Sequence, residues 1–398
     1  MQILPLIALG LATFGIATTE LVVVGLLPTM SEALGVTIPE AGLLVTGYAA
    51  GVVVAAPIVA VITNGLARKE TLLGLLVVFT IGNVLCALST TYWILMLARI
   101  VTAVGHAAFF GIASVIATQL VSEDRRASAV AVVFGGAAVA TILGVPLGTA
   151  IGQAFGWQAT FWTVACIGVV AMVAIAAWLP AGLQAEQVDW RGELVVLRDP
   201  QVLAALMVTG LTWCSVFAVF TFITPILEDV THLSEESVIW VLLLFGLGMT
   251  VGNFLGGRLG DWHLLPSVVG IIAGIAIMLA VMAIVVHSVA LVVISLVLWG
   301  VLIFGLAPLL QLWVVSAAKK APSVASTVNQ ASFHIGTASG AYIGASALTF
   351  GVTYSHLPWV GALMTLIALA VAAMAVRHEF QHRKAVFSVP TPSHAVGH

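Results

Sequence analysis

Long apolar segments separated by short polar breaks fill almost the whole chain of 398 residues. A helix needs roughly 20 consecutive apolar residues to cross the hydrocarbon core of a bilayer, and each segment approaches or exceeds that length. The pattern therefore predicts an all-α integral membrane fold with twelve transmembrane helices. We place them near residues 3–29, 41–63, 70–89, 92–120, 126–152, 157–180, 200–226, 236–257, 264–287, 289–317, 322–350 and 357–378.

One polar interval, residues 181–199, divides these helices into two groups of six. We predict an N-terminal six-helix bundle over 1–180, a cytoplasmic linker over 181–199 and a C-terminal six-helix bundle over 200–380. The last residues, 381–398, contain two prolines and three histidines, and we predict that they form a disordered tail.

The basic residues distinguish the two sides of the predicted bundles. Twelve of the thirteen fall on one side: Arg68, Lys69, Arg125, Arg126, Arg191, Arg198, Arg258, Lys319, Lys320, Arg377, Arg383 and Lys384. The opposite loops carry acids, such as Glu40 and Glu228, and no Lys or Arg. Because Lys and Arg are retained on the cytoplasmic side, we predict that both termini are cytoplasmic. The thirteenth, Arg99, lies within an apolar segment.

Composition excludes several classes of protein. Charged residues make up 7% of the chain and hydrophobic residues 61%, whereas about a quarter of the residues of a soluble domain are charged. A net charge of −3 is too small to indicate nucleic-acid binding. Three cysteines within apolar segments do not indicate a disulfide framework. We therefore expect a multi-pass protein in contact with the lipid bilayer and with no nucleic-acid partner. We also expect it to be a monomer of the inner (cytoplasmic) membrane.

The two predicted bundles share sequence features at an offset of about 190 residues. The fifth and eleventh helices each contain three glycines at four-residue spacing: Gly144, Gly148 and Gly152, and Gly336, Gly340 and Gly344. Two parallel six-helix repeats are one of the known transporter architectures, in which the substrate site lies near the midplane between the halves.

Three sequence patterns give the chain a family resemblance. They are Thr18-Thr19-Glu20-Leu21 with Gly25-Leu26-Leu27-Pro28, Ala98-Arg99 with Gly105-His106-Ala107-Ala108-Phe109-Phe110-Gly111, and Gly144-Val145-Pro146-Leu147-Gly148-Thr149 with Gly152-Gln153 and Gly156-Trp157. Over nearly its whole length the chain resembles the major facilitator superfamily, and within it the twelve-helix drug:proton antiporters of the sugar-efflux and chloramphenicol-resistance branch. The resemblance implies the major facilitator fold and proton-coupled efflux by alternating access. The energy source would be the proton gradient, with no cofactor.

One loop departs from the family pattern. After the second helix the superfamily usually has Gly-x-Leu-Ala-Asp, whereas this chain has Arg68 in place of the acid; the second half keeps Asp261. We therefore expect a single cytoplasmic latch, in which Asp261 faces Arg125 and Arg126 across the halves.

The glycines of the fifth helix, Gly144, Gly148 and Gly152, leave one face of that helix without side chains. Another helix can then approach closely, and Pro146 removes a hydrogen-bond donor and bends the span. The resemblance favours a gating role for this segment. Ordinary packing of small residues is the alternative.

Glu20 is the only acid deep within a predicted helix. A carboxylate inside a membrane is expensive and is usually functional or paired. A group balanced between burial and a nearby cation can take up and release a proton, so Glu20 is the candidate proton carrier. A structural ion pair is the alternative.

Arg99 is the expected partner of Glu20. Glu20 lies eight residues before Pro28 and Arg99 seven residues after Tyr92, so at about 1.5 Å per residue both lie roughly 11 Å below the outer face. Arg99 remains charged and would be a fixed counter-charge, either switched by protonation of Glu20 or permanently paired with it.

Two histidines reach a similar depth. His106 lies two helical turns beyond Arg99 on the same face and can relay protons or bind a polar substrate. His334 on the eleventh helix is a further substrate-binding candidate. A neutral histidine satisfied within the protein is the alternative for both. The sequence shows no second His, Cys or acid at ligand spacing to either, so we predict no metal site.

The remaining substrate-binding candidates are mostly aromatic: Tyr48, Phe110, Trp213, Phe217, Trp299, Asn329 and Phe333. With one deep acid and one deep Arg predicted to pair, we expect a small, neutral and partly apolar substrate or a sugar-like metabolite.

The sequence thus favours a proton-coupled efflux antiporter with a small molecule and protons as partners. One alternative is an uncoupled facilitator in which Glu20 is structural. An intramembrane enzyme would need a nucleophile or a second deep acid, and Ser114 has no visible activating group. A sensor of the same fold would usually need a soluble output domain, for which the linker and tail leave little length.

Overall fold

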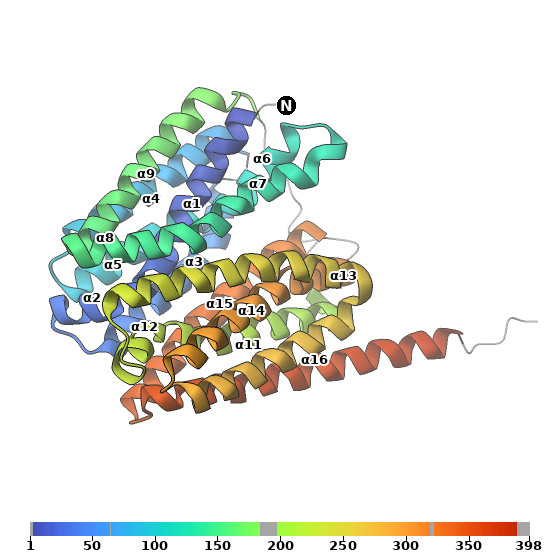
Figure 1. The fold of residues 1–398 in the computed structure, drawn as a ribbon. Coiled ribbons are helices and arrows are strands. Elements are labelled where there is room, and N and C mark those ends of the chain that lie inside the picture. Colours follow the sequence, from blue (N-terminus) through green and yellow to red (C-terminus); the bar gives the residue numbers. More distant parts are fainter. Residues whose placement is uncertain (1–2, 64, 184–196, 319–321, 388–398) are drawn as a thin grey trace, which may run out of the picture.

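The computed structural model describes residues 3–63, 65–183, 197–318 and 322–387, and all regular structure in these ranges is helical. Figure 1 shows two helical bundles packed against each other, one blue to green and one yellow-green to red. The predicted all-α membrane fold is confirmed. The centre of the linker and Lys319 and Lys320 lie outside the described residues.

The first bundle follows the predicted order of helices closely. It contains α1 (Ile3–Gly25), α2 (Leu27–Leu34), α3 (Ile38–Ile62), α4 (Arg68–Leu88), α5 (Tyr92–His106), α6 (Phe109–Gln119), α7 (Arg126–Val139), α8 (Val145–Phe155) and α9 (Trp157–Trp178). The second bundle contains α11 (Pro200–Phe220), α12 (Ile223–Pro225), α13 (Glu235–Val285), α14 (Val289–Ala317), α15 (Pro322–Thr349) and α16 (Leu357–Phe387).

Ten of the described segments are long and apolar enough to span a membrane. One of them, α13, has 51 residues and holds two of the predicted spans, because the backbone leaves the helical conformation at His263. The helix α15 is not among the ten, since Ser, Asn, Gln and His residues lower its hydropathy. With α13 counted as two spans and α15 added, the described helices give the predicted twelve.

Several predicted helices are interrupted, which corrects their expected boundaries. The predicted helix 3–29 breaks at Leu26, between α1 and α2. Pro28 has no N–H to donate, so the Val24 carbonyl four residues earlier loses its usual intrahelical partner. The other interruptions follow His106, occupy the π-helical turn Ala140–Gly144 just before Pro146, and follow Phe220.

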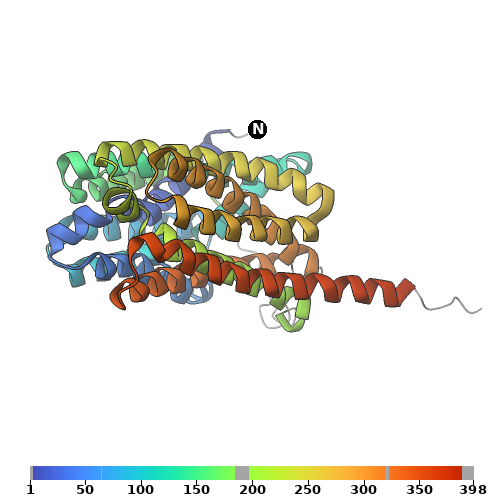
Figure 2. The same cartoon turned by 60° about the horizontal axis from the view of Figure 1, so that its bottom comes forward.

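The C-terminal helix is longer than expected. We predicted a helix ending near residue 378 and disorder from residue 381, but α16 continues to Phe387. Figure 2 shows α16, in red, extending well beyond the other helices. The mixed polar and apolar residues after Arg377 contain no Pro or Gly before Pro390, so nothing in that stretch ends the helix earlier. Residues 388–398 lie outside the described residues.

The glycine-rich helices pack against the first helix of their own bundle. A side chain at Gly144, Gly148 or Gly152 would collide with Thr18 or Val22 of α1 or with Leu26 just after it. One at Gly336, Gly340 or Gly344 would collide with Gly210, Cys214 or Ala218 of α11. Each of these contacts in the first bundle has an equivalent 192 residues later in the second. For example, the contact of Gly144 with Thr18 corresponds to the contact of Gly336 with Gly210. The expected close helix approach is present, and in the first bundle its partner is α1.

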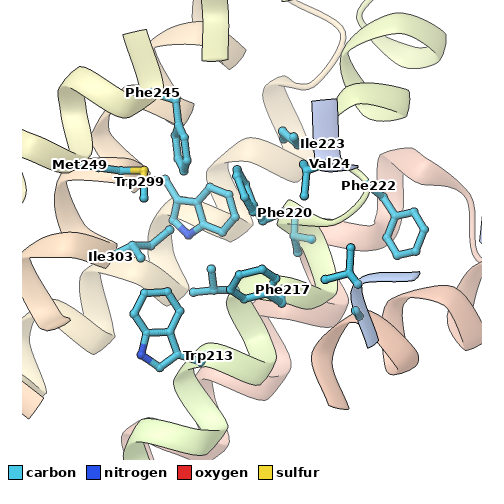
Figure 3. Packing of buried hydrophobic residues seen from close by; sticks show 14 of the residues in the cluster. Val24, Trp213, Phe217, Phe220, Phe222, Ile223, Phe245, Met249, Trp299 and Ile303 are labelled. Carbon is cyan, nitrogen blue, oxygen red and sulfur yellow. The ribbon is translucent and has the colours of Figure 1, made fainter. Parts of the chain in front are cut away.

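A cluster of aromatic side chains fills the core of the second bundle (Figure 3). Phe220 stacks on Phe245 with ring centroids 5.1 Å apart, and Phe245 contacts Trp299 at 5.9 Å. Trp213 and Phe217 continue the cluster along α11 at 6.2 Å. Such pairs add about 0.5–1.5 kcal/mol each beyond their buried area, so this bundle has a rigid interior.

The two bundles meet most closely at the outer end. There Thr224 Oγ1 donates a buried hydrogen bond of 2.9 Å to the Val24 carbonyl, the group left without a partner by Pro28. Phe222 packs onto Gly42 of α3, where a Cβ would lie 2.6 Å from its ring. In Figure 1 the bundles lie together near α2 and α12 and spread apart towards α6 and α7. The end where the ribbons lie apart carries Arg68, Arg125 and Arg126, so the positive-inside pattern assigns it to the cytoplasmic side and the contact at Thr224 to the outer side.

Glu228 provides a pH-dependent test of the outer loop. It lies half-buried in the π-helical turn Ile226–Val230, where burial and the nearby Glu235 and Asp229 raise its pKa from 4.5 to about 7. The folded protein therefore binds a proton there more tightly than the unfolded chain, so this contribution to stability is lost as the pH rises from about 4.5 to 7.

We expect Glu228→Gln to raise the free energy of unfolding at pH 8 by about 1 kcal/mol after solvent screening, and to change it little at pH 5. Thermal unfolding of the detergent-purified protein at both pH values measures this. The exposed Glu236→Gln is the matched control. An equal effect of Glu228→Gln at both pH values would contradict the argument.

Candidate functional site

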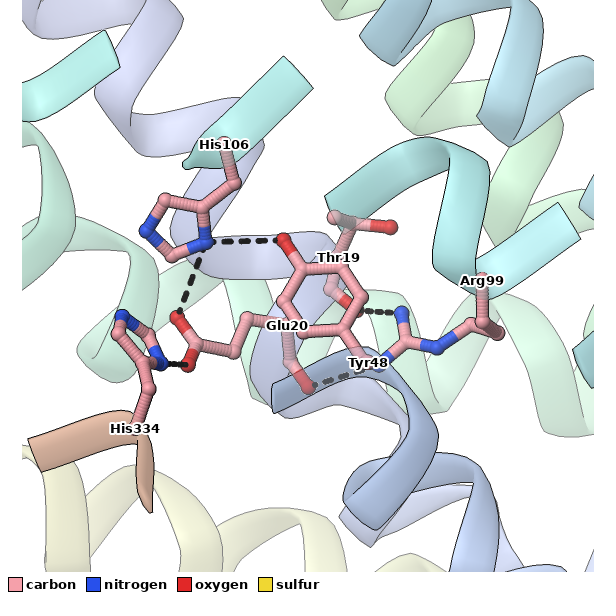
Figure 4. A network of polar contacts seen from close by, with 6 residues as sticks. All are labelled: Thr19, Glu20, Tyr48, Arg99, His106 and His334. Atoms are coloured by element: carbon pink, nitrogen blue, oxygen red, sulfur yellow. Dashed lines mark hydrogen bonds and ion pairs between the residues drawn. The ribbon is translucent and has the colours of Figure 1, made fainter. Parts of the chain in front are cut away.

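Glu20 lies five residues before the end of α1, at the interface between the bundles, with its carboxylate between two histidines (Figure 4). The Oε2 atom is 3.9 Å from Nδ1 of His106 on α5, and Oε1 is 3.6 Å from Nδ1 of His334 on α15. The side chains are 11%, 7% and 7% exposed. The carboxylate therefore touches both halves of the protein.

Arg99 does not pair with the Glu20 carboxylate, which corrects our prediction. Its guanidinium donates to the main-chain carbonyls of Thr19, at 2.6 Å, and Glu20, at 3.4 Å. It also lies 4.2 Å from the centroid of the Tyr48 ring, a cation–π contact. The depth argument placed the two residues at the same level, as observed. Depth could not give the direction of the Glu20 side chain. Its carboxylate points away from Arg99 and towards His106 and His334.

Tyr48 connects the arginine to the histidine pair. Its hydroxyl is 3.0 Å from Nδ1 of His106, and its ring receives the guanidinium of Arg99. Because Tyr48 is 1% exposed, it holds His106 in place in this conformation rather than lining an open surface. Phe110 completes the surroundings of His106, with ring centroids 5.3 Å apart.

Two of the facing atoms have no hydrogen-bond partner. Glu20 Oε1 and His334 Nδ1 are both buried and unpartnered, as is Arg99 Nε nearby. Orphaned buried polar atoms are rare and need a physical explanation. A single proton held between Oε1 and Nδ1 would satisfy both, so this pair is suited to taking up and releasing a proton.

The same groups also correct the prediction that no metal-ligand set exists. Glu20, His106 and His334 place ligand atoms within 4.8 Å of one another, which the sequence could not show because His334 comes from the other half. The fixed positive charge of Arg99, bonded to the Glu20 carbonyl, disfavours a divalent cation beside it. The arrangement fits a proton better than a metal.

The aromatic candidates divide into two groups. Phe333 lies next to His334, with centroids 4.8 Å apart, and against Trp213 at 4.4 Å and Phe217 at 6.3 Å. These three continue from the histidines into the second bundle. Trp299 is fully buried behind Phe245, so in this conformation it is a packing residue. A substrate-binding role for these residues stays a prediction.

Asn329 is not part of the Glu20 cluster. Its amide donates to Gln311 Oε1 at 2.7 Å and its oxygen accepts from Thr209 at 2.8 Å. Gln311 in turn donates to Ser326. The network joins α11, α14 and α15 and fully occupies Asn329, so its expected role as a substrate contact requires the network to open.

Sequence reasoning missed the residues that support Glu20 from behind. Thr19 Oγ1 donates to Asn83 Oδ1 at 2.6 Å, and the Asn83 amide donates to the Phe79 carbonyl at 2.9 Å. This buried network fixes α1 against α4. The signal in the sequence was an amide in the middle of an otherwise apolar helix, which we did not use.

The expected cytoplasmic latch is not formed at Arg126 in this conformation. Arg126 pairs with Glu123 of its own loop at 3.2 Å, and Asp261 is exposed. Because the bundles are apart on this side, a latch between Asp261 and the Arg125–Arg126 segment stays a prediction for the conformation closed towards the cytoplasm. At the glycine segment, contact between the halves is made by the π-helical turn, where Gly246 of α13 lies against the Thr141 carbonyl.

Comparison with known proteins places this arrangement among membrane transporters. The sequence model of the Major Facilitator Superfamily matches residues 9–341. The inner membrane transport protein YdhP of Escherichia coli K12 is 39% identical over 379 residues, covering 94% of this chain and 96% of the relative. The chloramphenicol resistance protein of Streptomyces lividans is 33% identical, covering 93% of this chain and 95% of the relative.

Solved structures share the fold at low sequence identity. The human organic anion transporter MFSD10 (TETRAN) has a TM-score of 0.69 at 16% identity, covering 93% of this chain and 99% of its own. A bacterial homologue of the human lysosomal transporter Spinster, in an inward-facing and unoccupied conformation, has a TM-score of 0.72 at 15% identity, covering 94% and 97%.

Proposed function

Because this chain belongs to the major facilitator superfamily of membrane transporters, we propose that it is a proton-coupled antiporter that exports a small, neutral, partly apolar molecule by alternating access. The observation that carries the proposal is the Glu20 carboxylate, buried at the interface between the halves with an unpartnered oxygen facing His334. A proton bound there touches both moving parts, so its arrival and departure can bias their relative position.

The transport cycle follows from this placement. With the outer end open, Glu20 would take a proton from outside. The halves would then close outside and open inside, and the proton would be released to the cytoplasm. Substrate would bind from the cytoplasm in exchange and be carried outward. Because the inward proton movement is downhill, each proton can drive one step of export.

The choice of substrate class rests on composition around the site and on one relative. Next to His334, the partly buried ring of Phe333 is apolar, with the buried Trp213 and Phe217 packed behind it, and Glu20 is the one acid of the described cluster. A neutral amphiphile fits such a site better than a strongly cationic one. A chloramphenicol resistance protein is a full-length relative, which supports export of a drug-like molecule; a sugar-like metabolite is the second substrate type to test.

We also propose that the protein lies in the inner (cytoplasmic) membrane and that it is a transporter without enzymatic activity. The relative YdhP is named as an inner membrane protein, which supports the inner (cytoplasmic) membrane for this chain. Ser114, the nucleophile considered above, donates its hydroxyl to the Phe110 carbonyl of its own helix at 2.7 Å. That bond gives the hydroxyl no general base, so the geometry offers no support for hydrolysis.

Transport by proteoliposomes tests the proposal. Labelled chloramphenicol-like compounds and simple sugars would be presented with a pH difference of about one unit, which is worth about 1.4 kcal/mol, or a tenfold gradient, per proton exchanged. We expect uphill movement that a protonophore collapses. Movement that only equilibrates the compound, at any pH difference, would favour the uncoupled facilitator instead.

The outer contact between the halves provides a separate test of alternating access. Thr224→Val removes the hydrogen bond to the Val24 carbonyl and leaves that carbonyl buried without a partner, a loss of about 1–3 kcal/mol for the outer-closed state. We expect the population to shift towards the outward-open state by about 5- to 150-fold. Labelling of a cysteine introduced at Phe222 from the outer side should become faster.

The matched control is Thr221→Val, because the Thr221 hydroxyl donates to the Phe217 carbonyl within its own helix. Thr221→Val should leave the labelling rate of the introduced cysteine close to the rate measured with both Thr221 and Thr224 unchanged. Equal rates for Thr224→Val and Thr221→Val would show that the bond between the halves does not hold the outer gate.

A further inference from the structure

The second bundle reaches the Glu20 carboxylate through one histidine. Within the described residues, the groups at ion-pair distance from Glu20 are His106 of the first bundle and His334 of the second. Movement between the bundles therefore changes the Glu20–His334 distance, whereas Glu20 and His106 move together. His334 is the group whose contact with the carboxylate depends on conformation.

The two histidines differ in whether the Nδ1 atom that faces Glu20 already has a hydrogen-bond partner. Nδ1 of His106 has the Tyr48 hydroxyl 3.0 Å away. Nδ1 of His334 is buried and has no partner, and neither has Oε1 of Glu20, which lies 3.6 Å from it. A small rotation of either side chain brings this pair to hydrogen-bond distance, and such bonds are often long in structures without substrate.

We propose that His334 is the positioning residue through which the second bundle detects the proton on Glu20, its Nδ1 accepting the hydrogen bond of the protonated carboxyl in the inward-facing state. The inference rests on the proton coupling proposed above. The ring stays neutral, with its own proton on Nε2. When the carboxyl loses its proton to cytoplasmic water, two acceptors face each other, and the contact between the halves changes from attraction to repulsion.

This sequence of events gives the coupling a direction. A protonated Glu20 favours the inward-facing state, because only there does His334 accept its proton. Release of the proton removes that preference, so the halves return outward with substrate more readily than they do while Glu20 is protonated. No bond other than the carboxyl O–H breaks or forms, and the proton passes from outer to inner water.

The surroundings of the pair contain few other titratable or charged groups. Those from the described elements packed around it are His106 and Arg99 on α5 and Tyr48 on α3. The Cys214 thiol of α11 instead accepts from Ser339, more than one turn along α15 from His334. A pH response that depends on residue 334 is therefore expected to report on Glu20 or on His106.

Two nearly isosteric substitutions separate this role from a structural one. In His334→Asn the amide oxygen can occupy the position of Nδ1 and still accept the proton, whereas in His334→Gln the amide reaches the position of Nε2. His334→Leu removes the acceptor altogether. We would measure accumulation in proteoliposomes driven by a pH difference of about one unit, and, separately, exchange of labelled for unlabelled substrate without a gradient. The exposed His356→Asn is the control.

We expect His334→Leu and His334→Gln to lose the tenfold accumulation while exchange continues, though at a lower rate, and His334→Asn to restore accumulation. Three results would overturn the proposal: full accumulation by His334→Leu, no difference between Asn and Gln, or a loss of exchange in all three, which would make His334 a substrate contact. If Glu20→Gln also accumulates substrate, the proposed proton coupling itself is wrong. If Glu20→Gln fails to accumulate while His334→Leu succeeds, only the role of His334 is wrong.

Discussion

Glu20→Gln should abolish uphill transport and leave substrate exchange intact. Gln has almost the same shape as a protonated Glu, so the site between His106 and His334 keeps its packing. It cannot release a proton, so the carrier would be held as if permanently protonated. With a pH difference of about one unit, accumulation should fall from about tenfold to none.

Both modes of transport must be measured for this result to be informative. Exchange of labelled for unlabelled substrate needs no net proton movement, so it should continue in Glu20→Gln. Glu32→Gln, an exposed acid at the outer end, is the matched control and should accumulate substrate normally. Uphill transport by Glu20→Gln would show that proton coupling runs through another group, and His106 would be the next residue to test.

Arg99→Gln should also cause a large loss of transport. The buried guanidinium holds the α1 main chain through the Thr19 and Glu20 carbonyls and stacks on Tyr48. Hydrogen bonds to a charged group contribute about 1.5–3 kcal/mol each, and Gln can replace at most one. We expect transport to fall at least about tenfold and the thermal unfolding temperature to drop by a few degrees.

Arg99→Lys distinguishes charge from geometry in this prediction. An ammonium keeps the charge but has no planar fork with which to reach both carbonyls, so transport should be intermediate between those of the unaltered protein and Arg99→Gln. The exposed Arg258→Gln is the control for loss of a positive charge. Normal transport by Arg99→Gln would mean that the link between α5 and α1 is dispensable.

The fold was predictable because its main determinants are local in sequence. The length of each apolar segment and the side on which Arg68, Arg125 or Arg258 falls can be read without knowing any contact. The helix breaks were predicted less well. We predicted a continuous helix over 3–29 and did not use Pro28 to break it. The group that bonds to the Val24 carbonyl freed by Pro28 is Thr224, 200 residues away, which no local pattern shows.

The site was predicted in part for the same reason. Glu20, Arg99 and His106 were identified because deep polar residues are conspicuous in apolar helices. The prediction that Arg99 pairs with the Glu20 carboxylate was wrong, because depth gives the level of a side chain in the membrane and not its direction around the helix. His334 was identified as a polar residue of the second half, but its position opposite the carboxylate depends on how two bundles pack, which no local pattern contains.

The polar character of α15 has a consequence for the biogenesis of the protein. This helix carries Asn329 and His334, and it is the one span too polar to qualify by hydropathy. A segment of this kind partitions poorly into lipid alone, because each uncompensated polar group raises the free energy of insertion. Its glycines, however, fit directly against α11. We therefore expect α15 to enter the membrane by docking on α11 after α11 is already inserted. The second bundle then assembles from inside outwards. Its least stable intermediate during synthesis is the one in which α15 is not yet inserted.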